Sequence, residues 1–137
     1  MFRFRDIEDA FFFVSLAGYG MHSAVLCKDT GRIFYRSEMG DLDEIGNEGL
    51  DWDTCIEIPH KNDLDLGHRL VFEFVESHLP DAYHRVQQIF RRRGAYGRFK
   101  DFLESTGLLQ SWYDFENRRE EQALRDWCEE NGIEISG

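Results

Sequence analysis

Residues 21–36 read Met-His-Ser-Ala-Val-Leu-Cys, then Lys-Asp-Thr-Gly, then Arg-Ile-Phe-Tyr-Arg. Two runs rich in apolar and β-prone residues flank an Asp-Thr-Gly sequence, a pattern typical of an antiparallel hairpin with a tight turn. Gly31 supplies a residue that takes a positive φ angle without steric cost. The stretch therefore predicts a two-stranded hairpin, around which the rest of the fold is interpreted.

The segments that flank the hairpin predict a helix, a loop and a further strand. Apolar residues at helical spacing predict a first helix over residues 6–16, with Asp6 as its N-cap. Residues 37–53 contain three glycines and many acids without periodicity, and they predict a loop. The weakly alternating run 55–58 stops at Pro59 and predicts a third, short strand.

From residue 62 onward the apolar period is that of helices. Asn62 or Asp63 is expected to cap a helix that ends at Pro80, and further helical stripes follow over residues 82–94, 99–107 and 108–132. The last stripe is one long helix or two stacked ones, and residues 133–135 return to the sheet or the core.

Strands followed by helices, without βαβ alternation, indicate the α+β class. We expect a single domain over residues 1–137, in which a small antiparallel sheet (the hairpin plus one short strand) packs against a C-terminal cluster of four to five helices. The apolar stripes of those helices predict four buried aromatic residues: Phe99, Phe102, Trp112 and Trp127.

The charge balance of the 137-residue chain is acidic, with 27 Asp and Glu against 16 Lys and Arg and a net charge of −11. Whole-surface binding to nucleic acid or to an anionic membrane requires a basic footprint, and this composition argues against it. The acids concentrate in residues 37–65, which we interpret as a solvated loop, with a docking face for a basic partner as the alternative. Residues 84–100, in contrast, hold six bases and no acid.

Three cysteines, Cys27, Cys55 and Cys128, lie far apart and form no Cys-x-x-C pair. We expect them to be separate reduced thiols in apolar surroundings, a pattern that suits the cytosol. No apolar stretch approaches the roughly 20 residues that span a bilayer. The first apolar run lacks a signal-peptide cleavage pattern, so a cytoplasmic protein without a membrane partner is expected.

Motifs that carry catalysis are missing from the sequence. It contains no Gly-x-Ser-x-Gly, no phosphate-binding loop, no dinucleotide fingerprint after a strand and no Cys/His spacing of a zinc site. We therefore expect no catalytic residue, no cofactor and no metal. A hydrolase or phosphate-handling enzyme stays open as an alternative, which a pocket with convergent His, Asp and Glu side chains would support.

The basic segment contains one feature that helix electrostatics does not explain. Arg91, Arg92 and Arg93 precede Gly94 in the last turn of a helix, where cations complement the helix dipole. Arg98 and Lys100 begin the following helix, where positive charge opposes the dipole. An internal carboxylate or an external anion must offset that cost, and a carboxylate partner is favoured for Arg98, an external one for Lys100.

Three stretches of the C-terminal half resemble the pattern of the bacterial Uncharacterised Protein Family 0158. They are Gly-Ala-Tyr-Gly-Arg-Phe-Lys-Asp at 94–101, Trp-Tyr-Asp-Phe at 112–115, and Ala123 with Trp127 and Ile133. The family pattern has Phe where this chain has Tyr96 and Arg where it has Gly97. The resemblance implies one domain over nearly the whole chain, and it implies no activity.

Together these features predict a small, acidic, non-catalytic binding or regulatory protein that contacts a partner protein through the basic-aromatic turn 94–100. A local contact with an anion or with nucleic acid through the same turn is a further alternative. So is an acidic mimic of nucleic acid that sequesters a basic protein. The residues predicted to bind are Gly94, Tyr96, Arg98, Lys100 and Tyr113.

Overall fold

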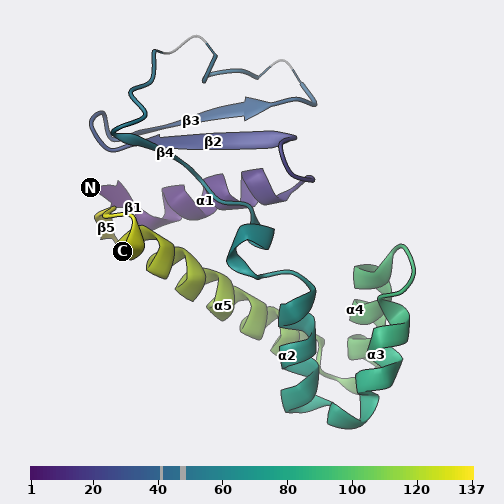
Figure 1. The fold of residues 1–137 in the computed structure, drawn as a ribbon. Helices are drawn as coiled ribbons and strands as arrows, with labels where there is room; N and C mark the ends of the chain where they lie inside the picture. Colours follow the sequence, from purple (N-terminus) through teal and green to yellow (C-terminus); the bar gives the residue numbers. More distant parts are fainter. Residues whose placement is uncertain (41, 47–48) are drawn as a thin grey trace. The chain divides into compact units, whose positions relative to one another are not determined.

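The hairpin predicted around Asp-Thr-Gly forms the centre of the sheet in the computed structural model, which describes residues 1–40, 42–46 and 49–137. Strands β2 (His22–Cys27) and β3 (Arg32–Ser37) pair antiparallel with Val25 opposite Phe34. Gly31 closes the turn at a φ of +71°. Strand β4 (Cys55–Glu57) pairs with the other edge of β2, so the order is β3-β2-β4, as Figure 1 shows. The predicted hairpin and third strand are confirmed.

The chain divides into two compact units, Met1–Leu64 with Ala123–Gly137, and Asp65–Gln122. In the first unit, helix α1 (Phe4–Ser15) packs against β2 and buries Ile7, Phe11 and Val14. The helix begins two residues before the predicted N-cap Asp6, which instead lies in the first turn, where a carboxylate favours the helix dipole. The α+β class is confirmed, and the single-domain organisation stays a prediction.

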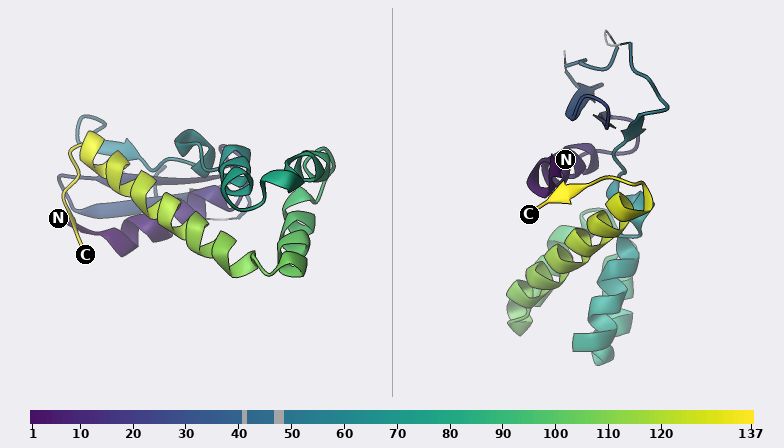
Figure 2. Two further views of the ribbon diagram at one scale, coloured as in Figure 1. Left: turned by 90° about the horizontal axis from the view of Figure 1, so that it is seen from below. Right: turned by 90° about the vertical axis from the view of Figure 1, so that its left-hand side faces the viewer.

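The two ends of the chain pair with each other within the first unit. Strand β1 (Phe2–Arg3) lies parallel to β5 (Ile135–Ser136), with Phe2 opposite Ile135. Both views of Figure 2 show the two chain ends close together. The run 133–135 thus returns to a sheet, but to this separate two-stranded pair and not to the hairpin.

The second unit is helical. The 3₁₀ turn η1 (Lys61–Leu64), in the first unit, takes up Asn62 and Asp63, whereas α2 (His68–His78) starts only after Gly67, so the predicted cap is wrong. A second 3₁₀ turn, η2 (Pro80–Ala82), leads into α3 (Tyr83–Ile89), and α4 (Ala95–Thr106) follows. The last stripe is one continuous helix, α5 (Leu109–Glu130), whose residues from Ala123 onward belong to the first unit.

Aromatic rings fill the interior of the second unit. Phe99 and Trp112 are fully buried and meet edge to face, with ring centroids 5.2 Å apart, and Phe74 meets Trp112 at 5.4 Å. Phe102 and Trp127 are only half-buried, so the prediction of full burial is wrong for these two. The ring of Phe102 lies at the helix edge, where the Arg85 guanidinium covers it at 4.7 Å from the ring centroid.

The expectation of three separate thiols is wrong, because Cys27 and Cys55 form a disulfide. The register between β2 and β4 places these residues directly opposite each other, with their Cα atoms 4.1 Å apart. Cys128 is buried outside the disulfide. The cysteine pattern therefore gives no support to a reducing compartment. Among the described residues, no helix is both long and apolar enough to cross a bilayer.

Candidate functional site

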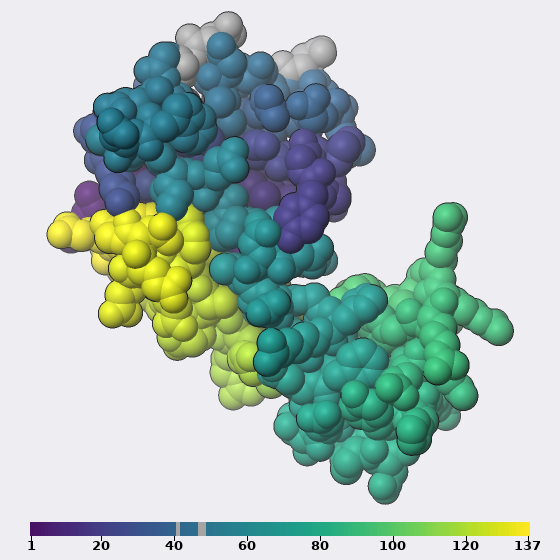
Figure 3. All heavy atoms as spheres, in the orientation of Figure 1, coloured from purple at the N-terminus to yellow at the C-terminus, as the bar shows by residue number. Residues whose placement is uncertain are grey.

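The turn that the sequence singles out joins α3 to α4. Helix α3 ends at Ile89, residues 91–93 form the connection, and Gly94 takes a φ of +72° before α4 begins at Ala95. A residue with a side chain is strained at that φ, so Gly94 shapes the corner. Figure 3 shows side chains of the green segment, around residues 90–100, projecting from the second unit.

Arg98 has an internal hydrogen-bond partner, but this partner is not a carboxylate. Its guanidinium donates a hydrogen bond to the carbonyl oxygen of Ile89 at 3.2 Å. That oxygen belongs to the last turn of α3, where unsatisfied carbonyls carry the negative end of the helix dipole. The cost of a cation near the start of α4 is thus offset by the end of α3. The predicted carboxylate partner is wrong.

Lys100 and Tyr113, two of the predicted binding residues, lie against each other. The ammonium nitrogen of Lys100 is 5.6 Å from the ring centroid of Tyr113, within the range of a cation–π contact. Both side chains are half-buried. The two residues therefore join α4 to α5 within the second unit, and Lys100 has an internal partner where an external one was favoured.

Tyr96 is mainly a packing residue. Its half-buried ring meets Phe90 edge to face with centroids 5.1 Å apart and lies 5.8 Å from the ring of His68. Burial, and then the negative charge of Glu116, raise the pKa of the Tyr96 phenol above its ordinary value of 10.0. The phenol is therefore neutral at physiological pH.

Four arginines line a pocket of about 470 Å³ beside this turn. We call it the basic pocket, and its lining residues are Arg85, Gln88, Ile89, Arg91, Arg92 and Arg98. All four arginines are exposed, and within residues 1–40, 42–46 and 49–137 none forms a salt bridge with a carboxylate. Four arginine residues around one pocket create a local positive potential on an acidic chain.

Sequence reasoning identified only Arg98 among the residues of the basic pocket. The sequence places Arg91 and Arg92 in the last turn of a helix, but α3 ends at Ile89, so that prediction is wrong; it attaches no role to Arg85. Arg85 and Gln88 share one face of α3, but Arg91 and Arg92 lie past its end, so no helical spacing in the sequence brings these residues together. Of the other predicted residues, Gly94 shapes the turn, while Tyr96, Lys100 and Tyr113 do not line the pocket. Their binding role stays a prediction.

A second pocket, of about 240 Å³, lies in the first unit and includes Tyr19, His60 and Asp63 in its lining. Such a convergence bears on the enzymatic alternative. The buried His60 ring donates from Nε2 to the carbonyl oxygen of Ala17 at 2.8 Å and accepts the N–H of Asn62 at Nδ1. Both ring nitrogens are thus occupied by backbone groups. The hydrogen bonds of His60 brace η1 against the loop after α1.

Both carboxylate oxygens of Asp63 also accept hydrogen bonds. One carboxylate oxygen accepts the hydroxyl of Tyr19 at 2.8 Å and the other accepts the backbone N–H of His60 at 3.0 Å. The hydrogen bond to Asp63 is the main reason that the pKa of Tyr19 is raised. A raised pKa makes the phenol a weaker nucleophile at neutral pH, so the arrangement of these three residues favours structure over catalysis.

The acidic loop uses carboxylates to hold its own backbone. Asp43 accepts the N–H of Gly46 at 2.7 Å, and Glu44 accepts the N–H of Tyr35 at 2.9 Å. Two further acids of this segment, at positions 41 and 48, lie outside the described residues. Because these carboxylates accept hydrogen bonds from nearby backbone N–H groups, they support the interpretation of a solvated loop over that of a docking face.

A family model, described as an uncharacterised protein family (UPF0158), matches residues 27–136. The chain belongs to the UPF0158 family. The matched residues include the hairpin turn, β4 and all four helices from α2 to α5, so the family pattern extends over both units. A comparison with curated proteins and one with solved structures found no match.

Proposed function

We propose that this UPF0158 protein is a non-catalytic binding module that contacts an acidic partner protein through the basic pocket and the adjoining turn 94–100. The cytoplasm, expected from the sequence, is the compartment of this proposal. The observation that carries it is that four exposed arginines line one pocket without a carboxylate partner among the described residues.

Electrostatics supports this surface as a binding site. The positive charges of the four arginines repel each other, and this repulsion lowers the stability of the folded chain. Binding of an anionic partner would remove the repulsion. The net charge of −11 does not cancel the local field, because exposed charges more than about 8 Å apart are largely screened at physiological salt. The positive potential at the pocket is therefore weakened only by carboxylates that lie within about this distance of it.

The chemistry of the pocket favours carboxylate groups on a protein surface. Guanidinium groups present planar pairs of donors that match carboxylates, and Gln88 adds a neutral amide beside them. The Phe102 ring packs against the Arg85 guanidinium in a cation–π contact. This contact limits the rotamers of Arg85, which lowers the entropy lost on binding.

The deciding experiment is affinity capture with the full chain and two matched double variants. Arg91→Gln/Arg92→Gln removes two pocket charges, whereas Arg5→Gln/Arg118→Gln removes two exposed charges that do not line the pocket. We expect the wild type and the control variant to recover the same partner protein, and the pocket variant to lose it. With the purified partner, the pocket variant should also show a flatter dependence of Kd on salt.

Two results would contradict the proposal. Equal recovery by the pocket variant and the control variant would remove the basic pocket from consideration. Recovery that disappears on nuclease treatment would identify nucleic acid as the ligand in place of a protein.

A further inference from the structure

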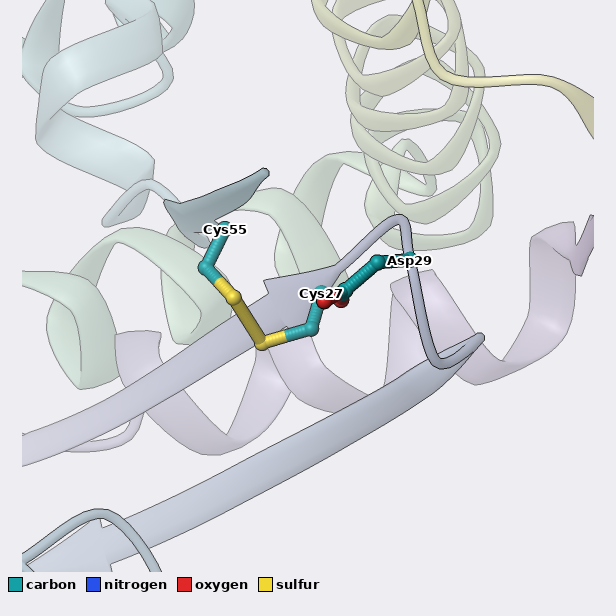
Figure 4. A group of neighbouring side chains, drawn as sticks. All are labelled: Cys27, Asp29 and Cys55. Atoms are coloured by element: carbon teal, nitrogen blue, oxygen red, sulfur yellow. A yellow bond between two sulfur atoms is a disulfide. The ribbon is translucent and has the colours of Figure 1, made fainter. Parts of the chain in front are cut away.

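The Cys27–Cys55 pair and Asp29 form a cluster of potential metal ligands, which Figure 4 shows side by side. Cys27 is the last residue of β2, Cys55 is the first of β4, and Asp29 stands in the hairpin turn just beyond β2. The two sulfur atoms and a carboxylate oxygen of Asp29 all lie within 4.8 Å of one another. This cluster is separate from the basic pocket.

We propose that the reduced Cys27–Cys55 pair, together with Asp29, is a binding site for a zinc ion. Reduction is a thiol–disulfide exchange with an external dithiol. The dithiol supplies two electrons and two protons and becomes a disulfide, and Cys27 and Cys55 become thiols. Zinc then binds the two thiolates, and both thiol protons pass to solvent.

The site survives loss of the sulfur–sulfur bond because the strand ladder holds the two cysteines in place. The backbone N–H of Lys28 donates to the carbonyl oxygen of Thr54 at 2.9 Å, on one side of the pair. On the other side, Leu26 stands opposite Ile56 in the same register. The cysteines occupy a non-hydrogen-bonded position between these pairs, where opposite side chains come closest. Reduction therefore leaves two adjacent thiols on a rigid frame.

The ligand set favours zinc over harder ions. Two thiolates and one carboxylate are ligands of zinc, whereas magnesium and calcium prefer oxygen alone. The Asp29 carboxylate is fixed in the turn by accepting the N–H of Thr30 at 2.9 Å. Asp29 is exposed, whereas both cysteines are buried, so the site is open to solvent on the side of Asp29. A water molecule on that side would be the fourth ligand and complete the tetrahedral coordination of zinc.

The test uses cobalt(II) as a spectroscopic probe on the full chain, reduced with a phosphine and kept anaerobic. We expect one cobalt ion per chain, a thiolate-to-cobalt charge-transfer absorption, and loss of that absorption when zinc is added. The oxidised protein and the Cys27→Ser/Cys55→Ser variant should show no such absorption. Cys128→Ser, which removes the buried cysteine outside the disulfide, should retain it.

A milder variant covers the case in which the cysteine variant does not fold. In Asp29→Asn an amide oxygen replaces the carboxylate oxygen as acceptor of the Thr30 N–H, so the turn is preserved. Loss of a residue that only hydrogen-bonds to a metal ligand weakens metal binding by roughly 10–100-fold. Loss of Asp29 as a direct ligand should weaken zinc binding by at least as much. Unchanged zinc affinity in Asp29→Asn, no charge-transfer absorption in the reduced wild type, or its loss in Cys128→Ser would each overturn the proposal.

Discussion

The guanidinium of Arg98 donates a hydrogen bond to the carbonyl oxygen of Ile89 at 3.2 Å, so a side chain from the first turn of α4 closes the last turn of α3. Arg98 is also one of the residues that line the basic pocket. Arg98 therefore stabilises the corner between the two helices, and the other three arginines of the pocket are better reporters of binding.

Replacing Arg98 with Gln should lower the free energy of unfolding. The lost hydrogen bond is exposed to solvent, so we expect a loss of about 1 kcal/mol or less. Arg91→Gln removes the same charge from the pocket at a position past the end of α3, and it should leave stability unchanged or raise it slightly, because it relieves like-charge repulsion. Urea unfolding followed by circular dichroism measures both, and equal stability of the two variants would contradict this role of Arg98.

The two phenylalanines of α4 should respond differently to truncation. Phe99 is fully buried between Phe90 and Trp112, so Phe99→Ala should cost about 3–5 kcal/mol. Phe102 is half-buried beneath Arg85, and Phe102→Ala should cost less than half of that. Denaturant unfolding of the two variants under identical conditions tests the difference. Similar losses would show that Phe102 belongs to the core after all.

Stability should decline at alkaline pH, and Tyr96 should contribute to the decline. Burial raises the pKa of its phenol above 10.0, so above pH 10 the unfolded chain releases a proton that the folded chain still holds. The unfolded state is then favoured as pH rises. In Tyr96→Phe the free energy of unfolding should fall less steeply above pH 10, while its difference from the wild type stays constant at lower pH. Parallel curves above pH 10 would exclude this contribution.

Thiol counting tests the disulfide directly. Oxidised protein that is denatured without a reductant should expose one free thiol per chain, that of Cys128, and reduction should raise the count to three. In the native state Cys128 should react slowly, because burial raises the pKa of its thiol and limits access. A count of three before reduction would show that Cys27 and Cys55 are not joined.

Local sequence was sufficient to predict most of the secondary structure. Gly31 and Gly107 each adopt the positive φ angle that turns or ends an element at the expected place, whereas α3 ends at Ile89, before the predicted end at Gly94. Helix ends without a side-chain cap were harder to predict. Asn62 and Asp63 resemble a helix start, but Asp63 instead accepts hydrogen bonds from the Tyr19 hydroxyl and the His60 backbone, and Gly67 begins α2.

By itself, the sequence determined the α+β class, the hairpin and the basic segment, because these follow from periodicity, turn residues and charge along the chain. Only the tertiary structure decided which residues meet. The disulfide joins positions separated by 28 residues, through a strand register that no local pattern encodes. The acceptor for Arg98 is a backbone carbonyl, and every residue has one, so residue type could not reveal it. Long-range pairing depends on how the strands and helices pack, and that information is spread over the whole chain.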